Sequence, residues 1–494
     1  MKRASGILMP IASLPNRFGI GDFGPETYKF VDLLKQSRQS YWEILPLQIT
    51  DTFGSPFASP SAFAGNWMLI SPEMLLKDRL IAKQAINKFI KPVAKINYHR
   101  INMNKRILLG LSWDYFKNKA TDKQKLSFNE FKITHQAWLA DYSAYMAIKD
   151  HYKGKPWYRW PKDLRHCNQP AIKRFFGQYS EALDFFAYGQ WLFQEQWCKL
   201  KYYTNQKGIN IIGDLPYAIA YDSVDVWASR NNFQVTKDGL VINQVGAPPD
   251  SFNKKGQIWG APAYDWSYQE KHDFDWQIRR FKKAAGWYDI IRLDHFRGYQ
   301  AFWQVSGKLK TAGIGKWQKV PGDIMFKKLS KQLPLHRLIA EDLGFITDEV
   351  IRLREKTNIP GMRILQFGMN NGKTDLHYPK NYPKNCVAYT GTHDLPTLKQ
   401  WFNASGTAEK WNSFNYARSN RQNIIWGLIK ALLYNQANLV LLPLQDILEL
   451  GPASRINTPG TTKNNWQWCL NSIPKTTNMY FQILKKETLL SKRG

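Results

Sequence analysis

Eight short apolar runs are spread along the chain, and most of them end in polar residues. Continuous apolar runs of this length are typical of parallel strands that are buried on both faces. Helical patterns such as PETYKFVDLLKQS and TDEVIRLREK fill most of the intervals. Strands that alternate with helices form a parallel sheet, and eight strands match a (β/α)8 TIM barrel. The runs begin at Gly6, Tyr41, Ile209, Asp289, Arg337, Met362, Cys386 and Leu439.

One interval is much longer than a loop between a strand and a helix. It contains long helical patterns such as EALDFFAYGQWLFQEQWCKL. We therefore expect an α/β protein in which residues 1–50 begin the TIM barrel and residues 206–494 complete it. Residues 51–205 form a large, mainly helical inserted subdomain between strands 2 and 3, with loops that reach the cleft. Further loop insertions are expected, including a Pro- and Gly-rich cleft loop at residues 246–260.

Composition favours a folded globular protein. The 494 residues are 44% hydrophobic and include 20 Trp, 24 Tyr and 27 Phe, and aromatic residues beyond the needs of a core often line ligand clefts. The apolar runs are too short to cross a bilayer, and the first residues show no signal-peptide pattern. Four widely spaced cysteines predict neither a disulfide framework nor a zinc site, which fits a cytoplasmic location.

The chain is strongly basic, with 69 Lys and Arg against 39 Asp and Glu and a formal charge of +30. Such a charge attracts nucleic acids and anionic membranes. The basic residues are spread along the chain, however, and no signature of a nucleic-acid module stands out. We expect a lysine-rich surface without a specific nucleic-acid or membrane partner.

The segment GIGDFG, residues 19–24, matches the G-x-G-x-x-G pattern of dinucleotide sites and lies between a predicted strand and a predicted helix. The segment SLPNRF separates it from the first apolar run. The acidic residue about 20 positions further on, Glu43, lies inside the second strand rather than at its end. We therefore expect no cofactor.

Carboxylic acids follow four of the eight runs, and in a barrel the ends of these strands meet at one mouth. Arg292 and Asp294 point to the same side of their strand, where the cation keeps the carboxylate ionised. Burial in an apolar context raises the pKa of Glu341 and keeps it protonated. Two carboxyls whose pKa values are pushed apart are typical of glycoside hydrolysis and transfer. The acids are Asp214, Asp294, Glu341 with Asp342, and Asp394.

A metal site is the competing interpretation of an acid cluster. The nine His residues include no H-E-x-x-H or H-x-H pair, and the neighbouring arginines repel a cation, so we expect no metal. His295 and His393 adjoin key aspartates and suit either hydrogen bonding to sugar hydroxyls or a structural role. Gln257 and Trp259 offer a polar contact and a stacking face for a sugar ring, although Trp259 equally fits packing beneath a loop.

Long motifs follow one another along nearly the whole chain: SGILMPIASLPNRFGIGDFG, SPFASPSAFAGN, GDLPYAIAYDSVDVWA, PPDSFNKKGQIWGAPAYDW, IRLDHFRG, AEDLG, TGTHD and RINTPGTTKNNWQW. In these motifs the chain resembles the amylomaltases, also called disproportionating enzymes or 4-α-glucanotransferases, of the α-amylase superfamily. The resemblance implies a barrel fold and a retaining mechanism through a covalent glycosyl-enzyme. It also implies transfer of α-1,4-glucan segments, from glucans and maltooligosaccharides, to glucose or other glucan acceptors.

The resemblance also implies roles for single residues. Asp294 matches the nucleophile, Glu341 the general acid/base, and Asp394 the carboxylate that stabilises the transition state. Residues 246–260 resemble a loop that closes over the substrate. The implied substrate contacts are Asp214, Arg292, His393, Gln257, Trp259, Phe252 and Phe57.

The chain departs from the family pattern at four positions. Phe57 stands where the family usually has Tyr, so the ring remains without its hydroxyl. Ser251 replaces an aromatic residue before Phe252, Ala261 replaces Asn, and Cys469 replaces Arg. The three catalytic carboxylates are intact, so we expect activity with an altered balance of transfer to hydrolysis. An α-glucan hydrolase and a degenerate glucan-binding protein are the alternatives.

Overall fold

Eight parallel strands close into a barrel in the computed structural model, which describes residues 2–249, 254–370 and 373–494. The order around the barrel is β1-β12-β11-β10-β9-β6-β3-β2. All eight apolar runs contribute these strands, so the predicted (β/α)8 barrel is confirmed. The strands are β1 (Ala4–Leu8), β2 (Tyr41–Glu43), β3 (Asn210–Leu215), β6 (Ile290–Leu293), β9 (Leu338–Ala340), β10 (Gly361–Ile364), β11 (Cys386–Tyr389) and β12 (Leu439–Pro443).

Alternation along the strands divides the core into two parts. Ile212, Ile339 and Met362 belong to the cluster that fills the barrel, whereas Ile211 and Ile291 pack into the cluster shared with the surrounding helices. Side chains two positions apart lie on the same face of a strand. Polar residues that continue an inward row, at the carboxyl end of a strand, therefore stand over the filled interior.

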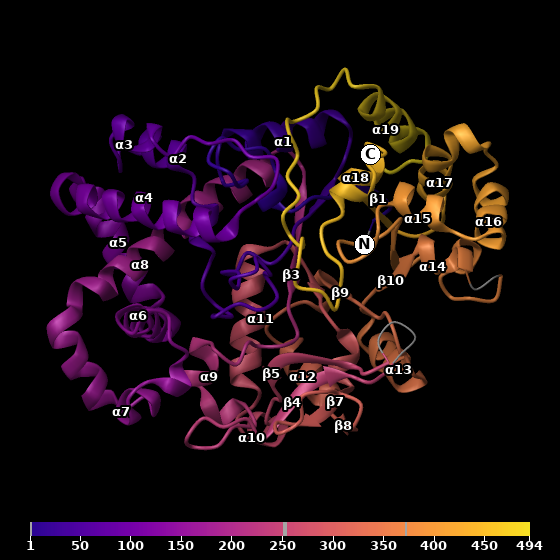
Figure 1. Ribbon diagram of the computed structural model, residues 1–494. Coiled ribbons are helices and arrows are strands. Elements are labelled where there is room, and N and C mark those ends of the chain that lie inside the picture. The colour runs from indigo at the N-terminus through magenta and orange to yellow at the C-terminus, as the bar shows by residue number, and fades with distance from the viewer. Residues whose placement is uncertain (1, 250–253, 371–372) are drawn as a thin grey trace.

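Helices cover the barrel and fill the long interval between β2 and β3. Helix α1 (Pro25–Gln36) begins with Pro25 and Glu26 and carries Lys35 in its last turn, as the helix dipole favours. The long interval contains α2 (Pro72–Lys77), α3 (Lys83–Asn87), α4 (Tyr98–Lys119), α5 (Asp122–Thr134), α6 (Gln136–His151), α7 (Lys162–Arg165) and α8 (Gln169–Gln206), on the left of Figure 1. The division into residues 1–50, 51–205 and 206–494 stays a prediction.

A second sheet was not predicted from the sequence. Its four antiparallel strands have the order β5-β4-β7-β8 and lie at the lower end of the view in Figure 1. The cleft loop predicted at residues 246–260 stays a prediction, but its first residues belong to β4 and its last to β5. These strands are difficult to predict because their glycines are typical of a loop. The pairing of β4 with β5 shifts register between Gln244 and Gly246, and Gly260 has a φ of +66°. The strands are β4 (Asn243–Ala247), β5 (Gln257–Pro262), β7 (Ala301–Ser306) and β8 (Lys316–Lys319).

The glycine-rich segment 19–24 has a structural role in the loop after β1. A Cβ atom on Gly21 would lie 1.9 Å from the carbonyl oxygen of Ile11, so no larger residue fits this backbone. Asp22 is buried and its carboxylate lies 2.8 Å from Nζ of Lys105, which is also buried. Lys105 donates a further hydrogen bond of 2.6 Å to the carbonyl of Ile70. This ion pair joins the loop after β1 to α4. None of the helices in the described residues is long and apolar enough to cross a membrane.

Replacement of Lys105 by Met is expected to lower the free energy of unfolding by roughly 3–5 kcal/mol, because the Asp22 carboxylate would stay buried without its counter-ion. Urea unfolding followed by tryptophan fluorescence measures the change. The double variant Asp22→Asn/Lys105→Met should recover part of the loss. Lys356→Ala removes an exposed ion pair with Asp323 and should cost at most about 1 kcal/mol. Equal small losses in both single variants would contradict a structural role for the buried pair.

Candidate active site

One buried guanidinium faces three carboxylates at the carboxyl ends of β3, β6 and β9. Nη1 of Arg292, on β6, lies 2.5 Å from Oδ2 of Asp214 on β3 and 3.6 Å from Oδ1 of Asp294, which directly follows β6. Nη2 lies 3.9 Å from Oε2 of Glu341, which directly follows β9. The structure therefore brings together four of the predicted site residues.

The three carboxylates differ in their access to solvent. The side chain of Asp214 is 1% exposed, whereas those of Glu341 and Asp294 are 17% and 27% exposed. Since Asp214 is enclosed and in contact with Arg292, it orients the guanidinium. Asp294 and Glu341 present oxygen atoms to the open mouth, where a ligand can reach them.

Backbone amides hold both accessible carboxylates in place. Oδ2 of Asp294 accepts a hydrogen bond of 3.1 Å from the amide of Tyr217. Oε2 of Glu341 accepts one of 2.5 Å from the amide of His295. His295 adopts a left-handed conformation with φ of +47°, and this turn after β6 directs its amide toward Glu341. The backbone therefore fixes one oxygen of each acid.

Burial and neighbouring charges separate the protonation states of these groups. Burial raises the pKa of Glu341 to about 8, although Arg292 acts in the opposite direction. Burial lowers the pKa of Arg292, but the surrounding carboxylates outweigh this effect and raise it well above its usual value. At neutral pH Glu341 therefore carries a proton and Arg292 its positive charge, so the mouth contains both a proton donor and a fixed cation.

Asp394 lies in the loop after β11, at the same mouth, and its charge also raises the pKa of Glu341. Its Oδ1 accepts a hydrogen bond of 2.6 Å from Nδ2 of Asn457, and its carbonyl accepts one of 2.9 Å from Arg455. The side chain is 38% exposed. Asp394 is thus anchored by the loop after β12 while one carboxylate oxygen faces the mouth.

An aromatic wall stands beside Asp394. Nε2 of the buried His393 lies 3.5 Å from Oδ2 of Asp394, and burial lowers the pKa of His393, which favours the neutral ring. The ring of Phe57 stacks on His393 at 5.4 Å between centroids and 17° between planes. Trp466 completes the group at 5.8 Å from Phe57. Phe57, a predicted substrate contact, therefore packs on the histidine that contacts Asp394.

Trp259 and Gln257 come from the other side of the mouth. Both are on β5, two positions apart, and both are half-buried. The Trp259 ring meets His295 edge to face at 4.7 Å and 89°. Burial lowers the pKa of His295 to about 4. The predicted contact Phe252 and its neighbour Ser251 lie outside the described residues.

One acid predicted to join the mouth does not do so. Asp342 is buried on the opposite side of the chain from Glu341, with Oδ2 at 3.2 Å from Nε of Arg354 and 3.3 Å from Nη1 of Arg363. Its Oδ1 accepts a hydrogen bond from the amide of Met362. Consecutive residues after a strand point in different directions, so only one of the pair enters the cleft.

Sequence reasoning missed several supporting groups. The groups that hold Asp294 and Asp394 are loop residues: Tyr217, Asn457 and Arg455. Loop residues that come together only in the folded protein have no periodic pattern in the sequence. Glu43 has a local signal in the sequence, because it is a carboxyl inside an apolar strand. It is buried, its pKa is raised by burial to about 7, and its charge acts on Arg292. Glu43 thus continues the polar interior beneath the mouth.

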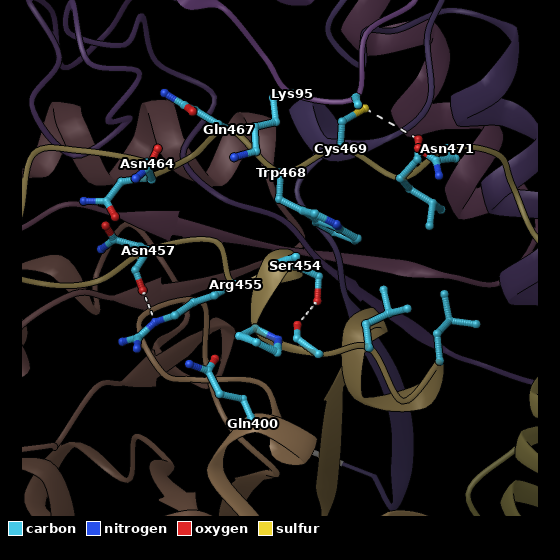
Figure 2. A pocket seen from close by; sticks show the side chains of 18 of the residues that line it. Lys95, Gln400, Ser454, Arg455, Asn457, Asn464, Gln467, Trp468, Cys469 and Asn471 are labelled. Carbon is cyan, nitrogen blue, oxygen red and sulfur yellow. Dashed lines mark hydrogen bonds between the residues drawn. The ribbon is translucent and has the colours of Figure 1, made fainter. Parts of the chain in front are cut away.

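A cavity of about 960 Å³ lies next to Asp394. Asn457 and Arg455, which hold Asp394, form part of its wall together with Trp468, Gln400 and Gln467 (Figure 2). Amide groups and an aromatic face suit a ligand that is rich in hydroxyls. In the described ranges, no group of three or more His, Cys, Asp or Glu side chains is arranged to hold a metal ion.

Comparisons with known proteins agree with the motifs. A family model described as 4-alpha-glucanotransferase matches residues 9–474. A 4-alpha-glucanotransferase of Aquifex aeolicus is 39% identical over 470 residues, which cover 94% of this chain and 95% of that protein. The chloroplastic/amyloplastic 4-alpha-glucanotransferase of Arabidopsis thaliana is 35% identical over 100% of this chain and 86% of its own. A solved structure of amylomaltase from Streptococcus agalactiae in complex with acarbose has a TM-score of 0.96 and 34% identity, with 100% of both chains covered. The chain belongs to the 4-alpha-glucanotransferase family.

Proposed function

We propose that this enzyme transfers segments of α-1,4-glucans to other glucans or to glucose by a retaining double displacement. The observation that carries the proposal is the arrangement around Arg292. This cation lies between an accessible carboxylate, Asp294, and an accessible protonated carboxyl, Glu341. Retaining glycoside chemistry requires such a pair, one group as nucleophile and the other as acid and then base.

The first step breaks the glycosidic bond. Glu341 gives its proton to the glycosidic oxygen while a carboxylate oxygen of Asp294 attacks the anomeric carbon. The reducing-end fragment leaves with the proton, and a covalent ester joins the remaining glucan to Asp294. The amide of Tyr217 holds Oδ2 of Asp294, and Nη1 of Arg292 lies 3.6 Å from Oδ1, so the carboxylate is oriented at the mouth before the attack.

The second step restores an α-1,4 bond. Glu341, now ionised, takes the proton from the 4-hydroxyl of an acceptor, whose oxygen displaces Asp294 from the anomeric carbon. Asn457 holds Oδ1 of Asp394, and Oδ2 faces the sugar. The negative charge of Asp394 stabilises the oxocarbenium-like transition state. Neutral His393 supplies hydrogen bonds to sugar hydroxyls beside it. Asp214 acts through Arg292.

Transfer requires that an acceptor sugar displaces the enzyme before water does. Strand β5 carries Gln257 and Trp259, and the ring of Trp259 contacts His295 at the mouth. Closure of the segment 246–260 over the glycosyl-enzyme, as the family resemblance implies, would exclude water. Phe57 offers a ring without the hydroxyl usual in the family, and Ser251 removes an aromatic acceptor contact. These departures favour a larger share of hydrolysis than in relatives that carry both aromatic residues.

We further propose a cytoplasmic enzyme without a specific nucleic-acid partner. The four cysteines are free thiols in the structure, as suits a reducing compartment. Neutral sugars account for the aromatic and amide groups of the cleft, and the basic residues contribute to solubility.

Purified enzyme incubated with maltotriose is expected to produce glucose together with maltopentaose and longer chains, measured by chromatography. Asp294→Asn should lower this rate by roughly 10⁴-fold or more, because the covalent intermediate cannot form. Asp275→Asn, an exposed aspartate on helix α11 (Asp275–Trp287), is the matched control and should leave the rate unchanged.

Other product patterns would contradict parts of the proposal. Glucose and maltose without longer chains would identify a hydrolase and point to the altered acceptor positions Phe57 and Ser251. Full activity in Asp294→Asn would exclude this residue as the nucleophile. A folded wild type that turns over neither maltotriose nor longer glucans would favour a glucan-binding protein.

The rate is expected to fall as pH rises through about 8, the pKa of Glu341, because the proton donor is lost above that value. Initial rates with maltotriose between about pH 5 and pH 10 measure the alkaline limb. A rate that stays constant beyond about pH 9 would assign proton donation to another group.

The same raised pKa makes stability depend on pH. The folded protein keeps a proton that the unfolded chain releases near 4.5, so the contribution of protonated Glu341 is full below that pH and is lost as pH approaches about 8. Glu341→Gln, which stays neutral, should lose less stability than the wild type between these pH values in thermal unfolding. Parallel curves for the two proteins would show that Glu341 titrates normally.

A further inference from the structure

A second groove, of about 1240 Å³, lies outside the catalytic mouth. It is bounded by α16 (Thr407–Ala417), α17 (Ile424–Leu433) and the first residues of α19 (Met479–Leu490). Figure 1 shows these helices on the side of the barrel away from α2 to α8. We call this surface the outer groove. None of the carboxylates used in the mechanism lines it.

Two exposed aromatic rings stand in the outer groove among polar and charged side chains. Trp411 on α16 is 66% exposed, and Tyr434 at the end of α17 is 52% exposed. Trp426 and Tyr480 also line it, with parallel rings at 6.3 Å and 6°. Nε1 of Trp426 is buried and has no hydrogen-bond partner in the described part of the chain. Large aromatic faces left in contact with water around a groove indicate a ligand.

Planar amides accompany these rings. Asn415 and Gln422 line the outer groove and are exposed, and no side-chain hydrogen bond engages either of them within the described ranges. Asn412 donates to the carbonyl of Met369 and presents its remaining amide oxygen. A pyranose ring has an apolar face, which stacks on aromatic rings, and hydroxyls at its edge, which hydrogen-bond to amides. The combination therefore fits a carbohydrate.

The outer groove is a neighbour of the cavity beside Asp394. Tyr480 lines both, and Glu449 of the outer groove lies between Leu448 and Leu450 of the cavity. The same cavity is lined by Asn457 and Arg455, which hold Asp394 (Figure 2). The outer groove and the cavity beside Asp394 are therefore adjacent and share Tyr480 as a lining residue.

We propose that the outer groove binds a stretch of α-1,4-glucan outside the catalytic mouth, so that the enzyme stays on long chains between transfers. The identity of the ligand rests on the proposed function. The groove also carries Lys373, Lys380 and Arg418, and its Lys430 pairs with Glu487 at 3.3 Å. A neutral glucan needs none of these charges, so its binding should not change between about 50 and 200 mM salt.

Native gel electrophoresis in gels that contain amylose tests the proposal. The wild type is expected to migrate more slowly with amylose, and Trp411→Ala/Tyr434→Ala should weaken this retardation about 5- to 10-fold in apparent affinity. The double variant should raise KM for amylose by a similar factor while its kinetic constants with maltotriose change less than about twofold. Trp411→Phe/Tyr434→Phe keeps the rings and should bind nearly as the wild type does. Tyr202→Ala, which removes an exposed tyrosine on α8, is the matched control.

Three results would overturn the proposal. These are a wild type that amylose does not retard, a double alanine variant retarded as strongly as the wild type, and a retardation abolished by about 200 mM salt. The last result would mean that charge, and not the aromatic faces, holds the polymer. Maltotriose turnover is measured separately, so a failure of the outer groove and a failure of the proposed transferase activity are distinguished.

Discussion

The buried guanidinium of Arg292 is the interaction on which the catalytic mouth depends. Barrel closure makes β3, β6 and β9 neighbours, and the register pairs Asp214 with Arg292 and Arg292 with Ile339. A single cation is thereby surrounded by acids from three strands. Its burial would be costly without them, and their proximity would be costly without it. Removal of Arg292 would therefore leave the buried Asp214 without its partner.

Position relative to the strand end gives each acid of this network a different role. Asp214 is the last but one residue of β3 and is enclosed, while Asp294 and Glu341 directly follow their strands and reach the cleft. Backbone amides at Tyr217 and His295 then hold one oxygen of each accessible acid. A shift of one residue along either strand would exchange the enclosed and accessible positions.

Around the mouth, aromatic and amide groups provide the contacts suited to sugars. Phe57 and His393 stack beside Asp394, Trp259 contacts His295, and Trp468 and Tyr480 line the neighbouring cavity. The formal charge of +30 plays no part in this arrangement. Recognition of a neutral polymer relies on ring faces and hydrogen bonds rather than on charge, so it does not require the lysines and the arginine that also line the outer groove.

The sequence by itself determined the eight strands, the family and the positions of the acids, because buried parallel strands are continuous apolar runs and the active residues follow them directly. It did not reveal the sheet of β4, β5, β7 and β8, whose glycines and register shift resemble a loop. Only the tertiary structure showed that Glu341 enters the mouth while Asp342 does not. It also showed that Asn457 and Arg455 donate hydrogen bonds to Asp394, and that the charge of Glu43 acts on Arg292. The direction of a side chain after a strand, and the approach of loops distant in sequence, depend on packing in three dimensions, which local pattern does not encode.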